Sequence, residues 1–392
     1  MIRRRSTTHR AEQAIAAAEE PRRPQLCTPD DEWDALVEGA GGDFKQTSMW
    51  AEVKRTVGWS TERVTVLRDG RVVGGAQVLA RHPRVLDAIR PAPIALVPSS
   101  PWSADDGDSL QEIVIEVMRL CVDKHVAWLK FQPTAGGSVD SDVLERVLRE
   151  QRFVRSDIHA CDRAIMRVRL SSDPDRVMAS LRRGLRSNIR KAQRRRLVSI
   201  REGNEDDLST FVDLMTVTAR RQRRMPFFPG AYYKQAWQSF ASRGRARLLL
   251  AEFEGQALSA ILLVTHGDIC EYLYGGWNGQ RSDLHPNELL QWSAIEWACE
   301  QGFGWYNLGH ITRATALRVM AGEYVSRTAA TGETRYKLGF NGQALLTPPA
   351  YDQTGRRSFR PVVRALAPRL SLAYPVISRT RGLVSGSARP GH

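Results

Sequence analysis

The chain repeats one pattern of strands and a helix, and this repeat constrains the fold more than any other feature. A strand, an acidic residue followed by glycine, and a second strand occur at residues 66–78 and again at 251–263. A helical pattern followed by an aromatic strand occurs at 109–133 and again at 287–309. An acidic-glycine pair supplies the positive φ that tight hairpins need. We therefore expect two copies of one α/β unit, each a mixed, mostly antiparallel sheet flanked by helices.

The length of 392 residues and the 42% hydrophobic content suit two such units. No apolar run approaches the length of a membrane-spanning helix, and no apolar segment follows the basic N-terminus, so neither a span nor a secretory signal is expected. The five cysteines are scattered without C-x-x-C spacing, which argues against a disulfide framework and a zinc site. A monomeric cytoplasmic protein without metal or other cofactors is expected.

We expect four parts along the chain. Residues 1–24 are predicted to be a disordered basic arm, 25–164 the first unit, 165–352 the second unit, and 353–392 a basic flexible tail. Residues 361–370 of this tail alternate basic and apolar side chains, a pattern compatible with peripheral contact at the inner face of an anionic membrane.

The net charge of +14 favours a polyanionic partner. Residues 181–201 contain nine basic side chains and no acid. A helix there would place its leucines and isoleucine on one face and arginines around the rest. Charge alone suits a solvated face as well as contact with RNA or phosphate. A second segment, 220–229, mixes arginine with aromatic residues before Tyr232 and Tyr233. That mixture suits base stacking together with phosphate contacts.

Three motifs carry a family resemblance that covers roughly residues 30–350. The run Gln46-Thr47-Ser48-Met49-Trp50, followed by Lys54 and Gly58-Trp59, resembles the signature near the start of FemABX-type peptidyltransferases. The stretch 181–192 is similar to the basic helix that opens their second domain, and 335–342 resembles their F-K-x-x-F-G motif. The resemblance implies a tandem GNAT fold. It also implies transfer of an amino acid from aminoacyl-tRNA to the peptide stem of a lipid-linked or UDP-linked murein precursor.

The resemblance also implies roles for individual residues. Lys337 would stabilise the oxyanion of the tetrahedral intermediate, and Tyr336 would help to place the tRNA 3′ end. The remaining expectations are substrate contacts from Gln46, Trp50, Lys54, Arg224, Tyr232 and Tyr233, and tRNA contacts from Arg186, Arg190, Lys191 and Arg194.

The chain departs from the family pattern where members often carry acidic residues. Gln132 stands before Pro133, and Asn307 opens the second-domain element that ends at His310. These departures favour a substrate-assisted mechanism over a carboxylate base, with His310 as a less favoured base. Three alternatives remain open: an aminoacyl-tRNA-dependent ligase acting on peptide antibiotics, an acyl-CoA N-acyltransferase, and a non-enzymatic RNA- or membrane-binding protein. Only the acyl-CoA alternative needs a pyrophosphate loop, and Gly74-Gly75 offers a weak match.

Overall fold

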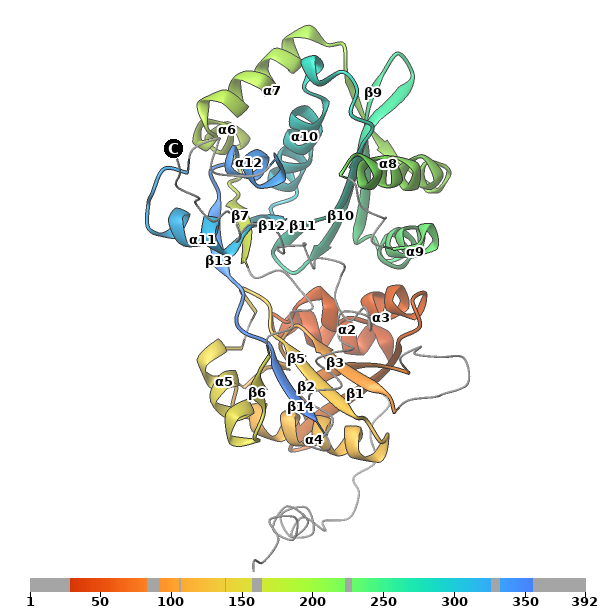
Figure 1. The fold of residues 1–392 in the computed structure, drawn as a ribbon, viewed down its shortest axis with the longest axis vertical. Helices are drawn as coiled ribbons and strands as arrows, with labels where there is room; N and C mark the ends of the chain where they lie inside the picture. The colour runs from red at the N-terminus through yellow and green to blue at the C-terminus, as the bar shows by residue number, and fades with distance from the viewer. Residues whose placement is uncertain are drawn as a thin grey trace, which may run out of the picture.

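The structure is a computed structural model that describes residues 29–82, 92–105, 107–137, 139–156, 164–222, 228–325 and 332–354. These residues form two lobes stacked along the long axis of the molecule, each a mixed sheet with helices on its faces (Figure 1). The expected fold class is therefore confirmed. The arm at 1–24, Arg224 and the tail from 355 onward lie outside the described residues.

The first sheet has the strand order β1-β2-β3-β5-β14-β6, with β4 paired to β2. Its strands are β1 (Ser60–Arg68), β2 (Arg71–Arg81), β3 (Ile94–Pro98), β4 (Trp102–Ser103), β5 (Trp128–Gln132), β6 (Val154–Arg155) and β14 (Tyr351–Thr354). The helices of this lobe are α2 (Asp30–Gly39), α3 (Ser48–Arg55), α4 (Leu110–Asp123) and α5 (Ser141–Glu150).

The second sheet has the order β13-β7-β12-β11-β10-β9-β8. Its strands are β7 (Ala164–Arg169), β8 (Ser199–Gly203), β9 (Ala246–Phe253), β10 (Gln256–His266), β11 (Ile269–Trp277), β12 (Trp305–His310) and β13 (Gln343–Leu346). Its helices are α6 (Pro174–Ser180), α7 (Arg183–Arg195), α8 (Leu208–Arg221), α9 (Gly230–Ala241), α10 (Pro286–Glu300), α11 (Arg313–Met320) and α12 (Gly332–Leu338).

The two copies inferred from the repeat occupy equivalent places in the two sheets. The hairpin β1–β2 turns at Asp69 and Gly70, and the hairpin β9–β10 turns at Glu254 and Gly255, all four with positive φ. In each lobe a helix, α4 or α10, then leads to a strand that pairs in parallel, β5 with β3 and β12 with β11. The repeat in the sequence thus corresponds to a repeat in topology.

Gly74 and Gly75 lie inside β2 and form no loop. The pairing of β1 with β2 shifts register between Val66 and Leu67, opposite these glycines, which is a β-bulge. A Cβ on Gly75 would lie 2.6 Å from the Val64 carbonyl oxygen, so close packing accounts for the glycine. The weak match to a pyrophosphate loop is therefore a packing feature.

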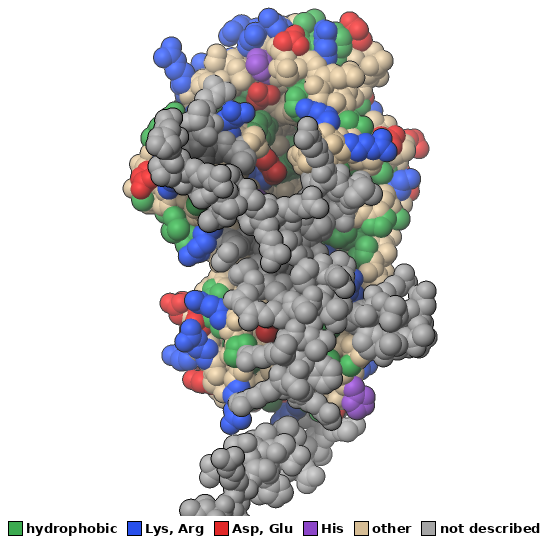
Figure 2. Space-filling model, viewed as in Figure 1, with side chains coloured by type: hydrophobic (Ala, Val, Ile, Leu, Met, Phe, Trp, Pro, Cys, Tyr) green, Lys and Arg blue, Asp and Glu red, His purple; other side chains and the backbone are tan. Residues whose placement is uncertain are grey.

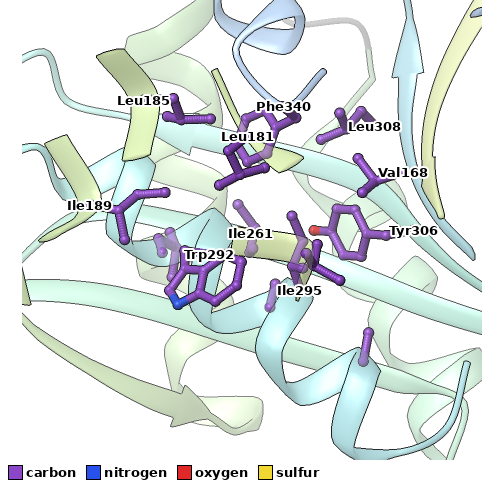
Figure 3. Close-up of a cluster of buried hydrophobic side chains, with 14 of the residues drawn as sticks. Val168, Leu181, Leu185, Ile189, Ile261, Trp292, Ile295, Tyr306, Leu308 and Phe340 are labelled. Carbon is purple, nitrogen blue, oxygen red and sulfur yellow. The ribbon is translucent and has the colours of Figure 1, made fainter. Parts of the chain in front are cut away.

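The inner face of α7 packs along α10, and together they cover the core of the second lobe. Leu181, Leu185 and Ile189 point from the α7 segment toward Trp292 and Ile295 of α10 (Figure 3). The helix has one apolar face and arginines elsewhere, as the spacing predicts, because burial of that face is what holds it on the sheet.

The first lobe contributes α3 to the second lobe's other core. Trp50 and Val53 of α3 are fully buried in one cluster with Phe211 of α8 and Phe240 of α9. The two lobes therefore share a hydrophobic core rather than only a chain connection, which restrains how they move relative to each other.

After the second lobe the chain returns to the first lobe through β14, which pairs antiparallel with both β5 and β6. There the Lys130 ammonium lies 2.6 Å from an Asp352 carboxylate oxygen and donates to the Ser156 hydroxyl at 2.6 Å. β14 therefore spans the boundary at 352/353 that was expected between the second unit and the tail, and its residues belong to the first sheet. Among the described residues, no helix is long and apolar enough to span a bilayer.

Candidate active site

The second sheet splits between β11 and β12. Only three residue pairs join these parallel strands, from Ile269↔Trp305 to Glu271↔Asn307, after which both strands continue unpaired with each other. In the first lobe the equivalent strands β3 and β5 stay paired over five residues, up to Pro98↔Gln132. The split therefore exists in one lobe only, and it exposes backbone and side chains at the ends of β11 and β12.

A bulge in β12 shapes one side of the split. The register of β12 with β7 shifts between Asn307 and Gly309, and Gly309 has φ +73°. The Asn307 side-chain oxygen accepts the Gly309 N–H at 2.8 Å. Asn307, which stands where an acidic residue is common in the family, thus holds the bulge, and the left-handed backbone there requires glycine.

Lys337 of α12 lies beside this bulge. Its side chain is only 3% exposed, and its ammonium donates to the His310 carbonyl at 2.9 Å and to a Glu333 carboxylate oxygen at 2.7 Å. A Cβ on Gly309 would come within 3.9 Å of the Lys337 nitrogen. A positioned ammonium at a split in the sheet is suited to stabilising negative charge that develops on a bound acyl group.

His310 contacts Lys337 through its main-chain carbonyl, so the imidazole takes no part in this contact. The Tyr336 hydroxyl donates to the Asn287 carbonyl at 2.9 Å, which anchors α12 to the start of α10. Burial raises the pKa of Tyr336 well above its ordinary value, so the hydroxyl stays protonated. Gly339 packs on Leu185, whose side chain a Cβ at this position would meet at 3.2 Å.

Lys54 lies in an aromatic pocket at the end of α3. Its nitrogen lies 4.6 Å from the centre of the Trp50 ring, 5.3 Å from Phe228 and 5.4 Å from Tyr232. It also donates to the Tyr232 hydroxyl at 3.3 Å. Burial, with smaller contributions from Lys45 and Arg81, lowers the pKa of Lys54 to about 7.

Tyr232 and Tyr233 of α9 complete this pocket with Phe228, from the arginine-aromatic segment 220–229, and with Tyr274, which no sequence motif singled out. Phe228 stacks on Tyr232 at 3.8 Å between ring centres, and Tyr274 of β11 contacts Tyr233 edge-on at 5.2 Å. The Tyr274 hydroxyl also donates to that of Tyr232 at 3.2 Å. The aromatic residues of β11 make Tyr274 noticeable in the sequence, but the sequence does not indicate that it contacts Tyr232 and Tyr233.

Gln46 and Trp50, expected to touch substrate, are both completely buried. The Gln46 amide donates to the Pro98 carbonyl, and its oxygen accepts the Gln77 N–H at 2.6 Å. These contacts tie the start of α3 to the first sheet and leave Gln46 no polar group facing outward. The structure thus gives the motif a scaffolding role: it positions Lys54.

The Lys54 pocket and the Lys337 site lie on opposite faces of the second sheet and are joined by β11. A bulge at Leu273 lets Tyr272 pack with the α7–α10 core while Tyr274 packs with the α3–α9 core. The Tyr272 carbonyl oxygen lies 4.0 Å from where a Gly309 Cβ would be. β11 therefore borders the split and contributes side chains to both cores.

The outer face of α7 is strongly basic. Arg190 and Arg194 line an open hollow of about 550 Å³ with Gln193 and Arg196, and basic side chains gather at this end of the molecule (Figure 2). Across the described residues, no carboxylate pairs with a basic side chain of α7; Arg186 and Arg195 instead donate to main-chain carbonyls. Arg190 and Arg194 are thus exposed to a polyanion, whereas Lys191 and Arg186 are half-buried, Arg186 against the end of α6.

Comparison with known proteins agrees with this geometry. Residues 179–338 match a family model described as an acetyltransferase (GNAT) domain. The chain is 21% identical over 364 residues to the Lipid II:glycine glycyltransferase of Staphylococcus aureus, covering 71% of this chain and 83% of the relative.

Two solved structures share the tandem arrangement. The crystal structure of FemX has a TM-score of 0.72 at 19% identity and covers 86% of this chain and 98% of its own. The structure of L-PGS from Bacillus licheniformis has a TM-score of 0.53 at 13% identity, with 88% and 97% covered. The chain therefore shares the tandem fold of FemX, and its residues 179–338 match the acetyltransferase (GNAT) domain.

Proposed function

We propose that this protein is an aminoacyltransferase that moves an amino acid from aminoacyl-tRNA onto the peptide stem of a lipid-linked peptidoglycan precursor. The observation that carries the proposal is the split second sheet, with a positioned ammonium on one face and an aromatic, cationic pocket on the other. Acyl transfer is the activity that the GNAT fold suggests. The relative from Staphylococcus aureus is named for transfer of glycine to lipid II, which supports the same class of acceptor here.

The donor ester would bind on the Lys337 side of the split. The amine nitrogen of the acceptor attacks the ester carbonyl carbon, the C–N bond forms, and the C–O bond to the tRNA ribose breaks. The proton lost by the amine ends on the departing ribose oxygen. The Lys337 ammonium, fixed between the His310 carbonyl and Glu333, would stabilise the oxyanion of the tetrahedral intermediate.

The acceptor would bind on the Lys54 side, where its phosphates meet the ammonium and the amine reaches the split beside β11. Phosphate contacts act equally in the ground state and the transition state. Lys54→Ala should therefore raise the KM for the precursor more than it lowers kcat. A large fall in kcat at unchanged KM would remove Lys54 from the phosphate site.

The experiment that tests the whole proposal offers the purified protein a mixture of aminoacylated tRNAs and a panel of acceptors. The panel contains lipid-linked and UDP-linked precursors and an amine-bearing peptide, and products are identified by mass spectrometry. We expect a precursor extended by an amino acid, and loss of this product after RNase treatment. A product that still forms after RNase treatment would refute the tRNA donor, and extension of the peptide alone would refute the acceptor.

A further inference from the structure

A solvent-exposed tyrosine follows α11, the helix that begins three residues after His310 of the Lys337 site, and its position gives it no role in the fold. Tyr324, just beyond α11, is 72% exposed, more than any other large hydrophobic side chain among the described residues. A ring left in water on a folded protein is an unused contact surface. It is accompanied on α11 by Leu317 and Met320, which are 47% and 57% exposed.

An arginine lies against this ring. The Arg182 guanidinium carbon lies 5.5 Å from the centre of the Tyr324 ring, and the same guanidinium donates to the Val325 carbonyl at 3.5 Å. The nearby carboxylate of Glu323 is paired with Arg318 at 2.9 Å, which reduces its repulsion of an anion. Tyr324 and Arg182 therefore present an aromatic face and a cation side by side, which we call the Tyr324 platform.

The platform is connected to Lys337 in two ways. The Arg182 main-chain N–H donates to the Gly339 carbonyl at 2.9 Å, two residues beyond Lys337. On the other side, α11 begins three residues after His310, whose carbonyl holds the Lys337 ammonium. A ligand whose reactive end lies at Lys337 passes over the platform as it leaves the site in this direction.

The basic face of α7 continues the path away from the platform. Arg182 immediately precedes α7, and Arg190, Arg194 and Arg196 follow along the helix. From Arg182 to Arg194 the helix covers about 18 Å, at roughly 1.5 Å per residue. A chain molecule that starts at Lys337 thus meets a stacking surface first and a row of cations afterwards.

We propose that the Tyr324 platform stacks an unpaired nucleotide at the 3′ end of the RNA donor, and that the α7 arginines then hold its phosphates. This inference rests on the proposed function and names a recognition surface for its donor. Stacking on an aromatic side chain beside arginine is how proteins hold single strands without reading sequence. A bilayer is the other candidate, but α7 would present it with a ridge of cations rather than a broad apolar face.

The test uses the full-length protein and tRNA in two forms, intact and lacking the unpaired 3′ nucleotides. Four proteins are compared: wild type, Tyr324→Ala, Tyr324→Phe and Tyr324→Leu. We expect Tyr324→Ala and Tyr324→Leu to bind intact tRNA roughly 5- to 100-fold more weakly, the usual loss of one stacked base, and Tyr324→Phe to bind like wild type. The shortened tRNA should bind all four proteins equally. The melting temperature should not change, because the side chain is exposed.

Three results would overturn the platform. The first is that Tyr324→Ala loses as much affinity for the shortened tRNA as for intact tRNA. The second is that Tyr324→Leu binds intact tRNA as tightly as wild type, which would show apolar contact without stacking. The third is a loss of binding to anionic vesicles in both Tyr324→Ala and Met320→Ser while tRNA binding is unchanged, which would assign the surface to a membrane. If wild type transfers from aminoacyl-tRNA with the same KM as Tyr324→Ala, the platform fails and the proposed function stands. Absence of tRNA binding by wild type refutes both.

Discussion

At the scale of single residues, the two lysines of the candidate site are held in opposite ways. Lys54 is surrounded by aromatic rings, and burial lowers its pKa to about 7. Lys337 is equally buried but has a carboxylate, Glu333, within 2.7 Å. One ammonium therefore lies in an environment that disfavours its charge, and the other in one that compensates it. A phosphate arriving at Lys54 would favour the charged form of its side chain.

The lowered pKa of Lys54 predicts how stability depends on pH. Between pH 7 and 10.5 the folded protein holds fewer protons at this residue than the unfolded chain does, so the free energy of unfolding rises with pH. Relative to Lys54→Met, the wild type should gain about 1–3 kcal/mol between pH 7 and pH 9. Denaturant unfolding of both proteins at the two pH values measures this, and parallel pH profiles would contradict the lowered pKa.

Lys337 should matter for the rate rather than for acceptor binding. Lys337→Met should lower kcat about 10²–10³-fold, the usual cost of losing one oxyanion donor, while the KM for the precursor stays near its wild-type value. Lys337→Arg should recover little, because a planar guanidinium does not reproduce a compact ammonium between His310 and Glu333. Full activity of Lys337→Met with charged tRNA in excess would exclude this residue from the mechanism.

At the scale of elements, the two faces of α7 have different roles. Leu185, Ile189 and Ala192 are buried against the second lobe, while the outer basic side chains have no carboxylate partner among the described residues. A cationic helix without compensation is costly unless a polyanion binds it. The apolar face alone explains why the helix folds, so the outer charges are free to serve binding.

This division predicts a salt effect that is separable from stability. Neutralising Arg190, Lys191 and Arg194 to Gln should flatten the slope of log K for tRNA against log salt, because fewer counterions are released. Neutralising three basic residues on a different surface, Arg119, Lys124 and Arg149, is the matched control and should leave the slope unchanged. Equal slopes in wild type and the α7 variant would move the RNA contact elsewhere.

At the scale of the whole molecule, several contacts join the two lobes, among them the Arg245–Glu38 ion pair. In addition, α3 of the first lobe enters a core of the second, and β14, which follows the second lobe in the chain, enters the first sheet. The Lys130–Asp352 pair fixes β14 in that sheet, with Lys130 completely buried. Both connections hold the lobes on either side of the site at Lys54 in one arrangement.

Removal of one member of this pair should destabilise the protein as a whole. Asp352→Asn leaves the buried Lys130 ammonium without its carboxylate and should lower the free energy of unfolding by about 3–5 kcal/mol. The double variant Lys130→Met with Asp352→Leu should recover most of that loss, because it buries no charge. Denaturant unfolding measures both. If the double variant were as unstable as the single one, packing of β14, and not charge, would be the cause.

Much of the fold followed from local pattern. The Asp-Gly and Glu-Gly turns, the two helices before the parallel strands and the apolar face of α7 each depend on residues close in sequence, so periodicity predicts them. The same holds for the position of Lys337 and Lys54, because their motifs are contiguous. The duplication, and with it the tandem fold, was thus determined by the sequence.

Contacts between distant segments needed the tertiary structure. Tyr274 joins the Lys54 pocket only because β11 bulges at Leu273, and Gln46 is a scaffold only because Gln77 and Pro98 surround its amide. The return of β14 to the first sheet and the split between β11 and β12 depend on pairing across the whole chain. Local periodicity carries no information on such pairing, because its free energy comes from burial and hydrogen bonds between residues far apart in sequence.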